Sequence, residues 1–229
     1  MLYFCSFVAT EEAARIGMVS YHSHILLSIE SEYAQYRLWE NRSDGSFFTH
    51  LRYANKEEHI MADQTQVDML KYQGVDDWNR WREENPNTDV DLSRAYLGGE
   101  NLQGVNLAGA NLSRADLTGI NLRGARLDGA NLNGAHLSGA KLGGAHFPGA
   151  DLTGADLQSA EMNGAEFRQA NLNKANLKGA QIPGADFVGA YLAGADLSEA
   201  NLQGSHLSGA DLTGADLTKT IVTDATGLW

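Results

Sequence analysis

A five-residue phrase repeats without interruption through more than half of this chain. Counting in steps of five from Leu92 to Leu217 gives 26 central positions, of which 21 are leucine. The residue two before each centre is alanine in 21 repeats, and the residue two after it is glycine in 19. A short fixed period of this kind is typical of a solenoid, because one repeat is too small to bury its own apolar side chain and has to stack on its neighbours.

A period of five fits neither a continuous α-helix nor a flat β-strand. A continuous α-helix would rotate successive leucines by about 500° per repeat, so that they would drift around the helix axis. A flat strand would place alternate leucines on opposite faces. We therefore expect a coil that turns a corner at each glycine, with leucine and alanine inside and the Asn or Asp before each leucine outside.

The exceptions at the centres indicate how many repeats form one coil. Phe147, Phe167 and Phe187 are 20 residues apart, as are Met162 and Ile182. If large side chains stack on their own kind, four repeats make one coil with a square cross-section and a phenylalanine ladder along one wall. The rod would then have about six and a half coils and a length of about 31 Å. The expected core includes Leu112, Leu132, Phe147, Leu152, Phe167 and Phe187.

Phrases such as "GANLSRADLTG" and "GADLTGADL" resemble the A(D/N)LXX consensus of the pentapeptide-repeat family, and the resemblance covers roughly residues 86–226. It implies a right-handed quadrilateral β-helix, so the expected fold class is an all-β solenoid. In this family a short helical segment commonly precedes the first coil. The resemblance supplies no biochemical activity, because most members have none assigned.

Residues 61–86 have the pattern of a helix. The apolar side chains step by three and four, and they are Val67, Leu70, Gly74, Trp78 and Trp81. Asp63 suits the N-cap, Gly74 offers a point at which two shorter helices could separate, and Pro86 ends the segment. The tryptophans fit either a partner-binding anchor or a helical cap over the first coil. We favour the cap, since the open end of a solenoid is an exposed sheet edge.

The β-helix itself is expected to occupy residues 87–229. At its C-terminal end, Leu228 and Trp229 are expected to fold over the last coil, although Trp229 is equally suited to contact a second copy in a homodimer.

Residues 1–60 are expected to form a poorly defined N-terminal extension. Residues 20–39 fit a helix or two strands, and Asp44 with Gly45 predicts a turn. The patterning becomes regular only at Met61, which suggests Met61 as the natural start and residues 1–60 as a non-native extension. An intact mass equal to that of all 229 residues in the native protein would contradict this hypothesis.

The overall charge limits the partners that the chain can bind directly. It carries 29 acidic and 17 basic side chains, a net charge of −12, which argues against nucleic acid and anionic membranes. The first nine residues are apolar but lack a basic n-region, so we expect a cytoplasmic protein rather than a secreted one. A single cysteine excludes an internal disulfide framework.

Four repeats per coil also sort the outward side chains into columns. The most acidic column, with Glu199 beside it, is the candidate interaction wall and runs Tyr96, Asp116, His136, Asp156, Asn176, Asp196 and Asp216. In the neighbouring column asparagine separates the carboxylates at most positions, and Arg94 and Arg114 form a small basic spot near its N-terminal end. The alternative is that these charges only keep the rod soluble.

Catalysis finds little support in this pattern. Asp116 and His136 would both be solvated on a flat wall, and no glycine-rich phosphate loop is present, so we expect no catalytic, cofactor or metal site. Two functions remain. The first is a non-catalytic protein-binding or scaffold module. The second is a DNA mimic that binds DNA gyrase, as implied by resemblance to the quinolone-resistance branch of the family. This chain departs from that branch because it lacks a projecting loop between coils and a long C-terminal helix.

Overall fold

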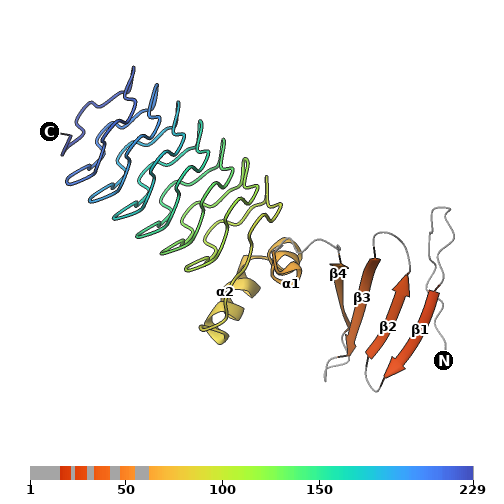
Figure 1. The fold of residues 1–229 in the computed structure, drawn as a ribbon. Coiled ribbons are helices and arrows are strands. Elements are labelled where there is room, and N and C mark those ends of the chain that lie inside the picture. Colours follow the sequence, from red (N-terminus) through yellow and green to blue (C-terminus); the bar gives the residue numbers. More distant parts are fainter. Residues whose placement is uncertain (1–15, 22–23, 30–33, 42–46, 55–61, 229) are drawn as a thin grey trace. The chain divides into compact units, whose positions relative to one another are not determined.

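Four antiparallel strands form a sheet in the N-terminal part of the chain (Figure 1). They are β1 (Ile16–Tyr21), β2 (His24–Ile29), β3 (Ala34–Asn41) and β4 (Phe47–Ala54), and they lie side by side in that order. The computed structural model describes residues 16–21, 24–29, 34–41, 47–54 and 62–228. The chain divides into two units, Met1–His59 and Ile60–Trp229, and each is described by itself.

For residues 20–39, the strand alternative is correct and the helix alternative is wrong. β2 pairs with β3 in a register that places Leu26 opposite Leu38. Both segments are rich in aliphatic and aromatic residues of the kind found in strands, and each has an antiparallel neighbour close in the sequence. The turn predicted at Asp44 and Gly45 lies outside the described residues.

The segment before the repeats is helical and is divided at Gly74. It consists of α1 (Gln64–Asp68), the π-helix η1 (Met69–Gln73) and α2 (Val75–Glu84). The Asp63 side chain accepts a hydrogen bond from the Thr65 amide at 2.9 Å, which confirms the N-cap. Gly74 has φ of 89°, a conformation that glycine adopts without strain, so the predicted helix breaks there.

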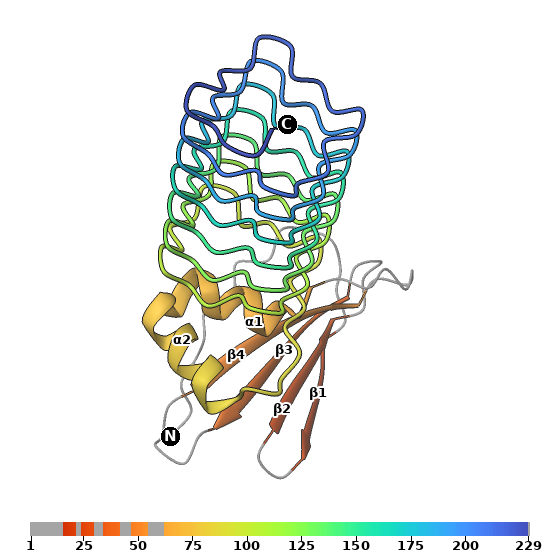
Figure 2. The same cartoon turned by 90° about the vertical axis from the view of Figure 1, so that its left-hand side faces the viewer.

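The repeats form coils of 20 residues, as the spacing of the phenylalanines predicts (Figure 2). Parallel bridges join residues one coil apart, from Asp91↔Asn111 to His206↔Thr226. The array therefore continues past Leu217, the last leucine of the uninterrupted count. Each coil is hydrogen-bonded to the next through the backbone, as where the Leu112 amide donates to the Asn131 carbonyl at 2.7 Å.

Each repeat contributes one side and one corner of the coil. The corner is closed by a short backbone bond, such as the Ala115 amide to the Leu112 carbonyl at 3.0 Å. The residue just before that amide is in the left-handed region, with φ of 63° at Gly134 and 57° at Arg114. This conformation explains the glycine in most repeats, since side chains with a Cβ are disfavoured there.

The predicted core residues lie inside the coils. Their exposed fraction is 0 % in each case, for Leu112, Leu132, Phe147, Leu152, Phe167 and Phe187. The phenylalanine rings stack as predicted, with centroids 4.8 Å apart between Phe147 and Phe167 and 5.0 Å apart between Phe167 and Phe187. The core is thus one continuous apolar column that extends along the array.

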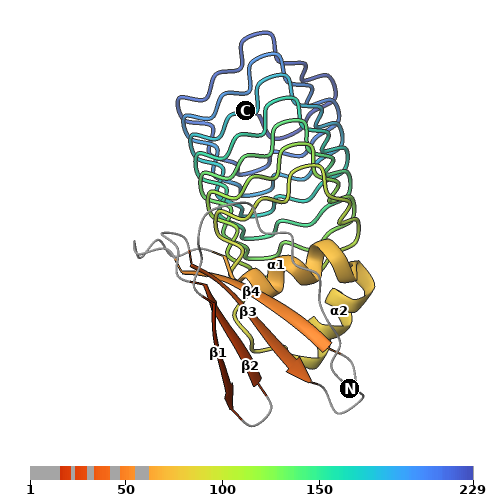
Figure 3. The same ribbon diagram turned by 90° about the vertical axis from the view of Figure 1, so that its right-hand side faces the viewer.

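α1 and α2 contact the first coil (Figure 3). Trp78 is fully buried, and its indole N–H donates to the Asn106 carbonyl at 2.8 Å. The Asn79 amide side chain donates to the Gly104 carbonyl at 3.0 Å and accepts from the Asn106 amide at 2.8 Å. At Asn106, Asn79 therefore supplies the acceptor, and Trp78 the donor, that the backbone of a preceding coil would offer.

Two further side chains complete these contacts. Gln66 donates to the Asp89 carbonyl and accepts from the Asp91 amide, each at 2.9 Å. Arg82 donates to the Ala108 carbonyl at 2.7 Å, and its burial lowers the pKa of the guanidinium. The helical segment thus hydrogen-bonds to the exposed backbone edge of the first coil on more than one side.

The C-terminal end of the array is more open. Leu217 and Val222 are each 36 % exposed, whereas Leu197 and Leu202, one coil earlier, are 0 % exposed. Leu228 packs against the core, as expected of a terminal cover. Trp229, the other residue expected there, lies outside the described residues.

The candidate interaction wall

One wall of the array carries the candidate interaction residues, one per coil. We call it the acidic wall, and its outward column is joined by consecutive parallel bridges through Tyr96, Asp116, His136, Asp156, Asn176, Asp196 and Asp216. The structure therefore brings these predicted residues together in a line. Glu199 lies at the corner that follows Leu197 on the same wall, with φ of 61°.

Histidine and asparagine separate most of the aspartates in the outward column of the acidic wall. His136 stands between Asp116 and Asp156, and the Asn176 amide donates to the Asp156 carboxylate at 2.9 Å. Carboxylates two coils apart are separated by about 10 Å, a little beyond the screening length of physiological salt, so they repel each other weakly. Within the outward column itself, only the carboxylates of Asp196 and Asp216 occupy adjacent coils.

The aspartates of the acidic wall also have a local structural role that the sequence analysis missed. Each accepts a hydrogen bond from the amide two residues further on, with N–O distances of 3.1 Å for Asp116, 3.2 Å for Asp156, 2.9 Å for Asp196 and 2.8 Å for Asp216. This is the Asx turn, and the Asn or Asp before nearly every centre was the available signal for it. The carboxylates are therefore held in fixed positions at the surface.

Basic side chains offset only part of this charge. Asp116, Asp156, Asp196, Glu199 and Asp216 share the acidic wall with Lys178 and Lys219. Lys219 approaches Glu199 at 3.9 Å, but both side chains are more than half exposed, and such a pair is worth about 0–1 kcal/mol. The acidic wall therefore keeps an excess of negative charge.

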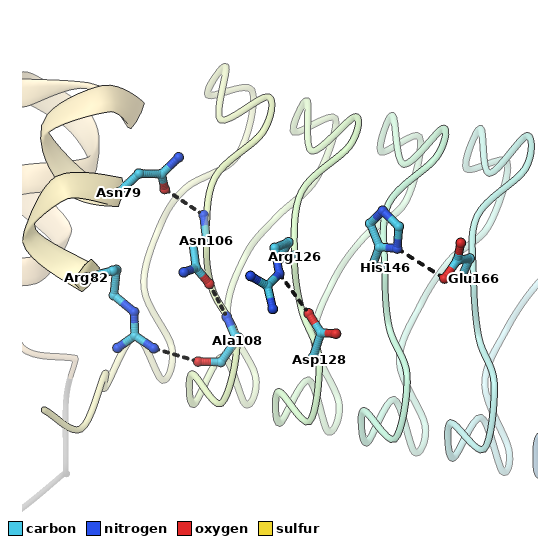
Figure 4. A network of polar contacts seen from close by, with 8 residues as sticks. All are labelled: Asn79, Arg82, Asn106, Ala108, Arg126, Asp128, His146 and Glu166. Carbon is cyan, nitrogen blue, oxygen red and sulfur yellow. Dashed lines mark hydrogen bonds and ion pairs between the residues drawn. The ribbon is translucent and has the colours of Figure 1, made fainter. Parts of the chain in front are cut away.

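The opposite wall, which holds the three phenylalanine centres and is called the phenylalanine wall, is compensated by its own ion pairs. Arg126 forms an ion pair with Asp128 at 3.4 Å, and the ring of His146 is hydrogen-bonded to the Glu166 carboxylate at 3.1 Å (Figure 4). Further along, Arg168 approaches Asp186 at 2.6 Å. The two walls therefore differ in how much charge they leave available to a partner.

Hydrogen bonding shifts the protonation of several array aspartates. Hydrogen bonds from the Thr118 amide and hydroxyl lower the pKa of Asp116. Those from Thr218 do the same for the pKa of Asp216. At Asp186, partial burial alone would raise the pKa, but bonds from the Val188 amide and the Arg168 side chain outweigh it, so the pKa is lowered.

These shifts predict a loss of stability in acid. A lowered folded-state pKa means that folding favours the ionised carboxylate, so the stabilisation is present above the unfolded pKa and is lost as the pH falls through the folded one. We expect the melting temperature to fall below about pH 4. Circular dichroism melts between pH 7 and pH 3 measure it. Asp186→Asn should be less stable than the wild type at pH 7 and lose less on acidification; equal acid losses in both proteins would contradict this assignment.

Arg94 and Arg114 lie at consecutive corners between the acidic wall and the neighbouring wall, as the predicted basic spot requires. On that neighbouring wall, the Asn111 amide donates to the Asp91 carboxylate at 3.1 Å, so asparagine pairs with a carboxylate rather than only separating two of them. Among the residues that the structure describes, no group of three His, Cys, Asp or Glu side chains could hold a metal ion.

The fold and its walls define a solenoid of 20-residue coils, in which the backbone of each coil is hydrogen-bonded to the coils next to it. The model of the family described as "Pentapeptide repeats (8 copies)" matches residues 88–124, 115–154, 150–189 and 185–224. The chain belongs to the pentapeptide-repeat family. None of the curated proteins matches it.

Several solved structures are similar to the chain. A trypsin-treated variant of QnrB1, a plasmid-mediated fluoroquinolone resistance protein, is 26% identical, with 58% of this chain and 76% of that chain covered and a TM-score of 0.37. HetL, a pentapeptide repeat protein involved in heterocyst differentiation regulation in Nostoc sp. strain PCC 7120, is 30% identical, with coverages of 60% and 81% and a TM-score of 0.23. A pentapeptide repeat protein of the Arabidopsis thaliana thylakoid lumen is 38% identical, with coverages of 45% and 68% and a TM-score of 0.28.

Within the described residues, no helix has the length and apolar character that crossing a membrane requires.

Proposed function

We propose that this chain is a non-catalytic binding module that presents the acidic wall to a protein partner with a basic surface. The observation that carries the proposal is the contrast between two opposite walls. The acidic wall has five carboxylates and two lysines, whereas the cations of the phenylalanine wall pair with its own carboxylates. A flat wall with fixed charges suits recognition of a surface rather than chemistry on a small molecule.

The backbone geometry supports this role. Each Asp of the acidic wall is fixed by its Asx turn, and the coil repeat of about 4.8 Å sets its distance from the others. A partner therefore meets charges that need little reordering on binding, which reduces the entropic cost of association. Charge complementarity of this kind mainly sets the association rate and the choice of partner.

The test compares two triple variants in protein capture from native cell extract. Replacing Asp156, Asp196 and Asp216 with Asn removes three charges from the acidic wall but keeps the acceptor oxygens of the Asx turns. Replacing Asp128 with Asn and Glu161 and Glu166 with Gln removes the same charge from other walls. We expect the first variant to lose partners that the wild type and the second variant retain, and that loss to be reproduced by raised salt.

Retention of the same partners by the acidic-wall variant would contradict the proposal. Circular dichroism of both variants establishes that each has kept the β-helix, so that the loss of a partner is not a loss of fold.

A DNA mimic that binds DNA gyrase is the alternative. The acidity and the uninterrupted rod favour it, but the charge density does not. Residues 89–229 carry 15 acidic and 9 basic side chains, a net charge of −6. Duplex DNA of the same length, about 31 Å, has about 18 phosphate charges. A supercoiling assay decides between them, since absence of gyrase inhibition at high molar excess of protein would remove the mimic.

The helical segment of α1, η1 and α2 acts as an N-terminal cap, supported by its hydrogen bonds to the first coil. The more exposed Leu217 and Val222 at the C-terminal end of the array provide the surface for a homodimer, and sedimentation equilibrium measures whether it forms. The cytoplasm is the compartment that we propose.

A further inference from the structure

Two arginines on consecutive coils lack a carboxylate partner within the described part of the chain. They are Arg94 and Arg114, which are 20 residues apart and therefore stacked at one corner of the array. The other three arginines of the array each approach a carboxylate, at 2.6 Å for Arg123, 3.4 Å for Arg126 and 2.6 Å for Arg168. Among the arginines of the array, which lie in a chain with a net charge of −12, these two are the ones without a salt bridge to a described residue.

The position of the two arginines is unfavourable for folding by itself. Both occupy the left-handed corner, with φ of 58° and 57°, where most repeats have glycine. Such a conformation costs a side chain about 1–2 kcal/mol. Two like charges on neighbouring coils repel each other as well. A bound anion would offset the second of these costs.

The arginines border a concave region on the acidic wall. An open cavity of about 510 Å³ is lined by Arg94, Arg114, Tyr96, Thr118, His136 and Ser138, with Asp116 also in contact. The side chain of Arg114 extends along the corner, since its Cγ lies near the backbone of Gly134 on the next coil. The lining of the cavity therefore combines two arginines with residues that carry hydroxyl, phenol and imidazole groups.

We propose that this cavity is a binding site for a phosphate monoester, with Arg94 and Arg114 as its main ligands. The guanidinium group matches the geometry of phosphate oxygens and forms paired, charge-assisted hydrogen bonds with them. Neutral hydroxyls such as those of Ser138 and Tyr96 add donors without adding charge. The two arginines of this site are positively charged, whereas the rest of the acidic wall is negatively charged. An experiment can therefore contradict this inference without contradicting the proposed function, and the reverse.

The negative charge of Asp116 opposes the binding of an anion in this cavity. Its carboxylate accepts from the Thr118 amide at 3.1 Å and remains ionised because its pKa is lowered. A singly charged anion gains little beside it, whereas a dianion interacts more strongly with the two guanidinium groups. Asp116→Asn keeps the acceptor of the Asx turn and removes the opposing charge, so we expect it to tighten phosphate binding about two- to fivefold.

The experiment is an NMR titration of the full chain at pH 7.5 and low salt. The probes are inorganic phosphate, a blocked tripeptide with a central phosphoserine, and the same tripeptide without phosphate. We expect saturable shifts with both phosphate probes at amides near Tyr96, Thr118 and His136. Replacing Arg94 and Arg114 with Gln should weaken binding at least about tenfold, and binding should also weaken as salt rises.

A matched control removes two other charges. Replacing Arg123 and Arg126 with Gln lowers the net charge by the same amount on different walls and should leave the affinity unchanged. Tighter binding of the phosphopeptide than of inorganic phosphate would assign the site to a phosphorylated side chain, and equal binding would assign it to free phosphate esters. Unchanged binding in the Arg94 and Arg114 variant, or equal binding of the unphosphorylated peptide, would overturn the proposal.

Discussion

Phe167→Ala is expected to lower the free energy of unfolding by about 3–5 kcal/mol. Phe167 is fully buried between two other rings, with centroids 4.8 Å from Phe147 and 5.0 Å from Phe187. Alanine would leave a cavity in the middle of the column, and the coils could close it only by breaking the backbone bonds that hold them at fixed spacing. Both neighbouring rings would lose one stacking face as well.

Phe167→Leu is the matched control, because leucine occupies 21 of the 26 centres. It should cost about 1–2 kcal/mol, since most of the volume is retained. Denaturant unfolding measured by circular dichroism gives both values. A Phe167→Ala protein within 1 kcal/mol of the wild type, or a leucine variant as unstable as the alanine one, would contradict the role of the ladder.

The coil was predictable because every repeat places the same kind of side chain in the same environment. Leucine at one period and three phenylalanines at four times that period indicate a square coil, since coils of four repeats place Phe147, Phe167 and Phe187 on adjacent coils of one wall. The outward columns follow from the same count. Asp116 and Asp156 are therefore on one wall in the structure, as they are in the sequence pattern.

The pairing of outward side chains was less predictable, because it depends on rotamers and not on register. Arg94 and Arg168 occupy the outside of the array in similar ways in the sequence. Only the structure shows that Arg168 reaches Asp186, while Arg94 borders a cavity beside Tyr96. The hydrogen bonds of the Asx turns were within reach of sequence reasoning, since they need only Asp or Asn two residues before a free amide.

The contacts of the helical segment with the first coil could not be predicted from the sequence. Gln66, Asn79 and Arg82 resemble ordinary solvent-exposed helix residues in a pattern of apolar and polar positions. Their role depends on where the helices dock, because each hydrogen-bonds to a backbone group more than 20 residues away. A periodicity of three and four identifies the buried face with Trp78 but says nothing about the residues beside it.

Trp78→Ala is expected to detach the helical segment from the first coil. The indole is fully buried and donates to the Asn106 carbonyl at 2.8 Å. It also lies beside the Trp81 ring, with centroids 5.2 Å apart and planes tilted by 42°. Removing a buried tryptophan costs about 3–5 kcal/mol, which is a large share of the stability of a typical domain. Detachment would also free the backbone groups that Asn79 and Arg82 satisfy.

Hydrogen exchange at individual amides measures whether the first coil becomes less protected when the helical segment detaches. Amides of the first coil, including Asn106, should lose protection in Trp78→Ala, whereas amides of the central coils should keep it, since each coil is stabilised by its neighbours. The Trp78→Phe variant keeps most of the apolar contact but loses the indole hydrogen bond, so we expect an intermediate loss of about 1–2 kcal/mol.

Tyr72→Ala controls for a change in the same segment, because Tyr72 is 80% exposed. It should alter stability by less than about 0.5 kcal/mol. An uncovered first coil presents an unpaired ladder edge, so Trp78→Ala should also associate at concentrations where the wild type does not. If the first coil of Trp78→Ala stayed as protected as in the wild type, the helical segment would be an attachment to the array rather than its cap.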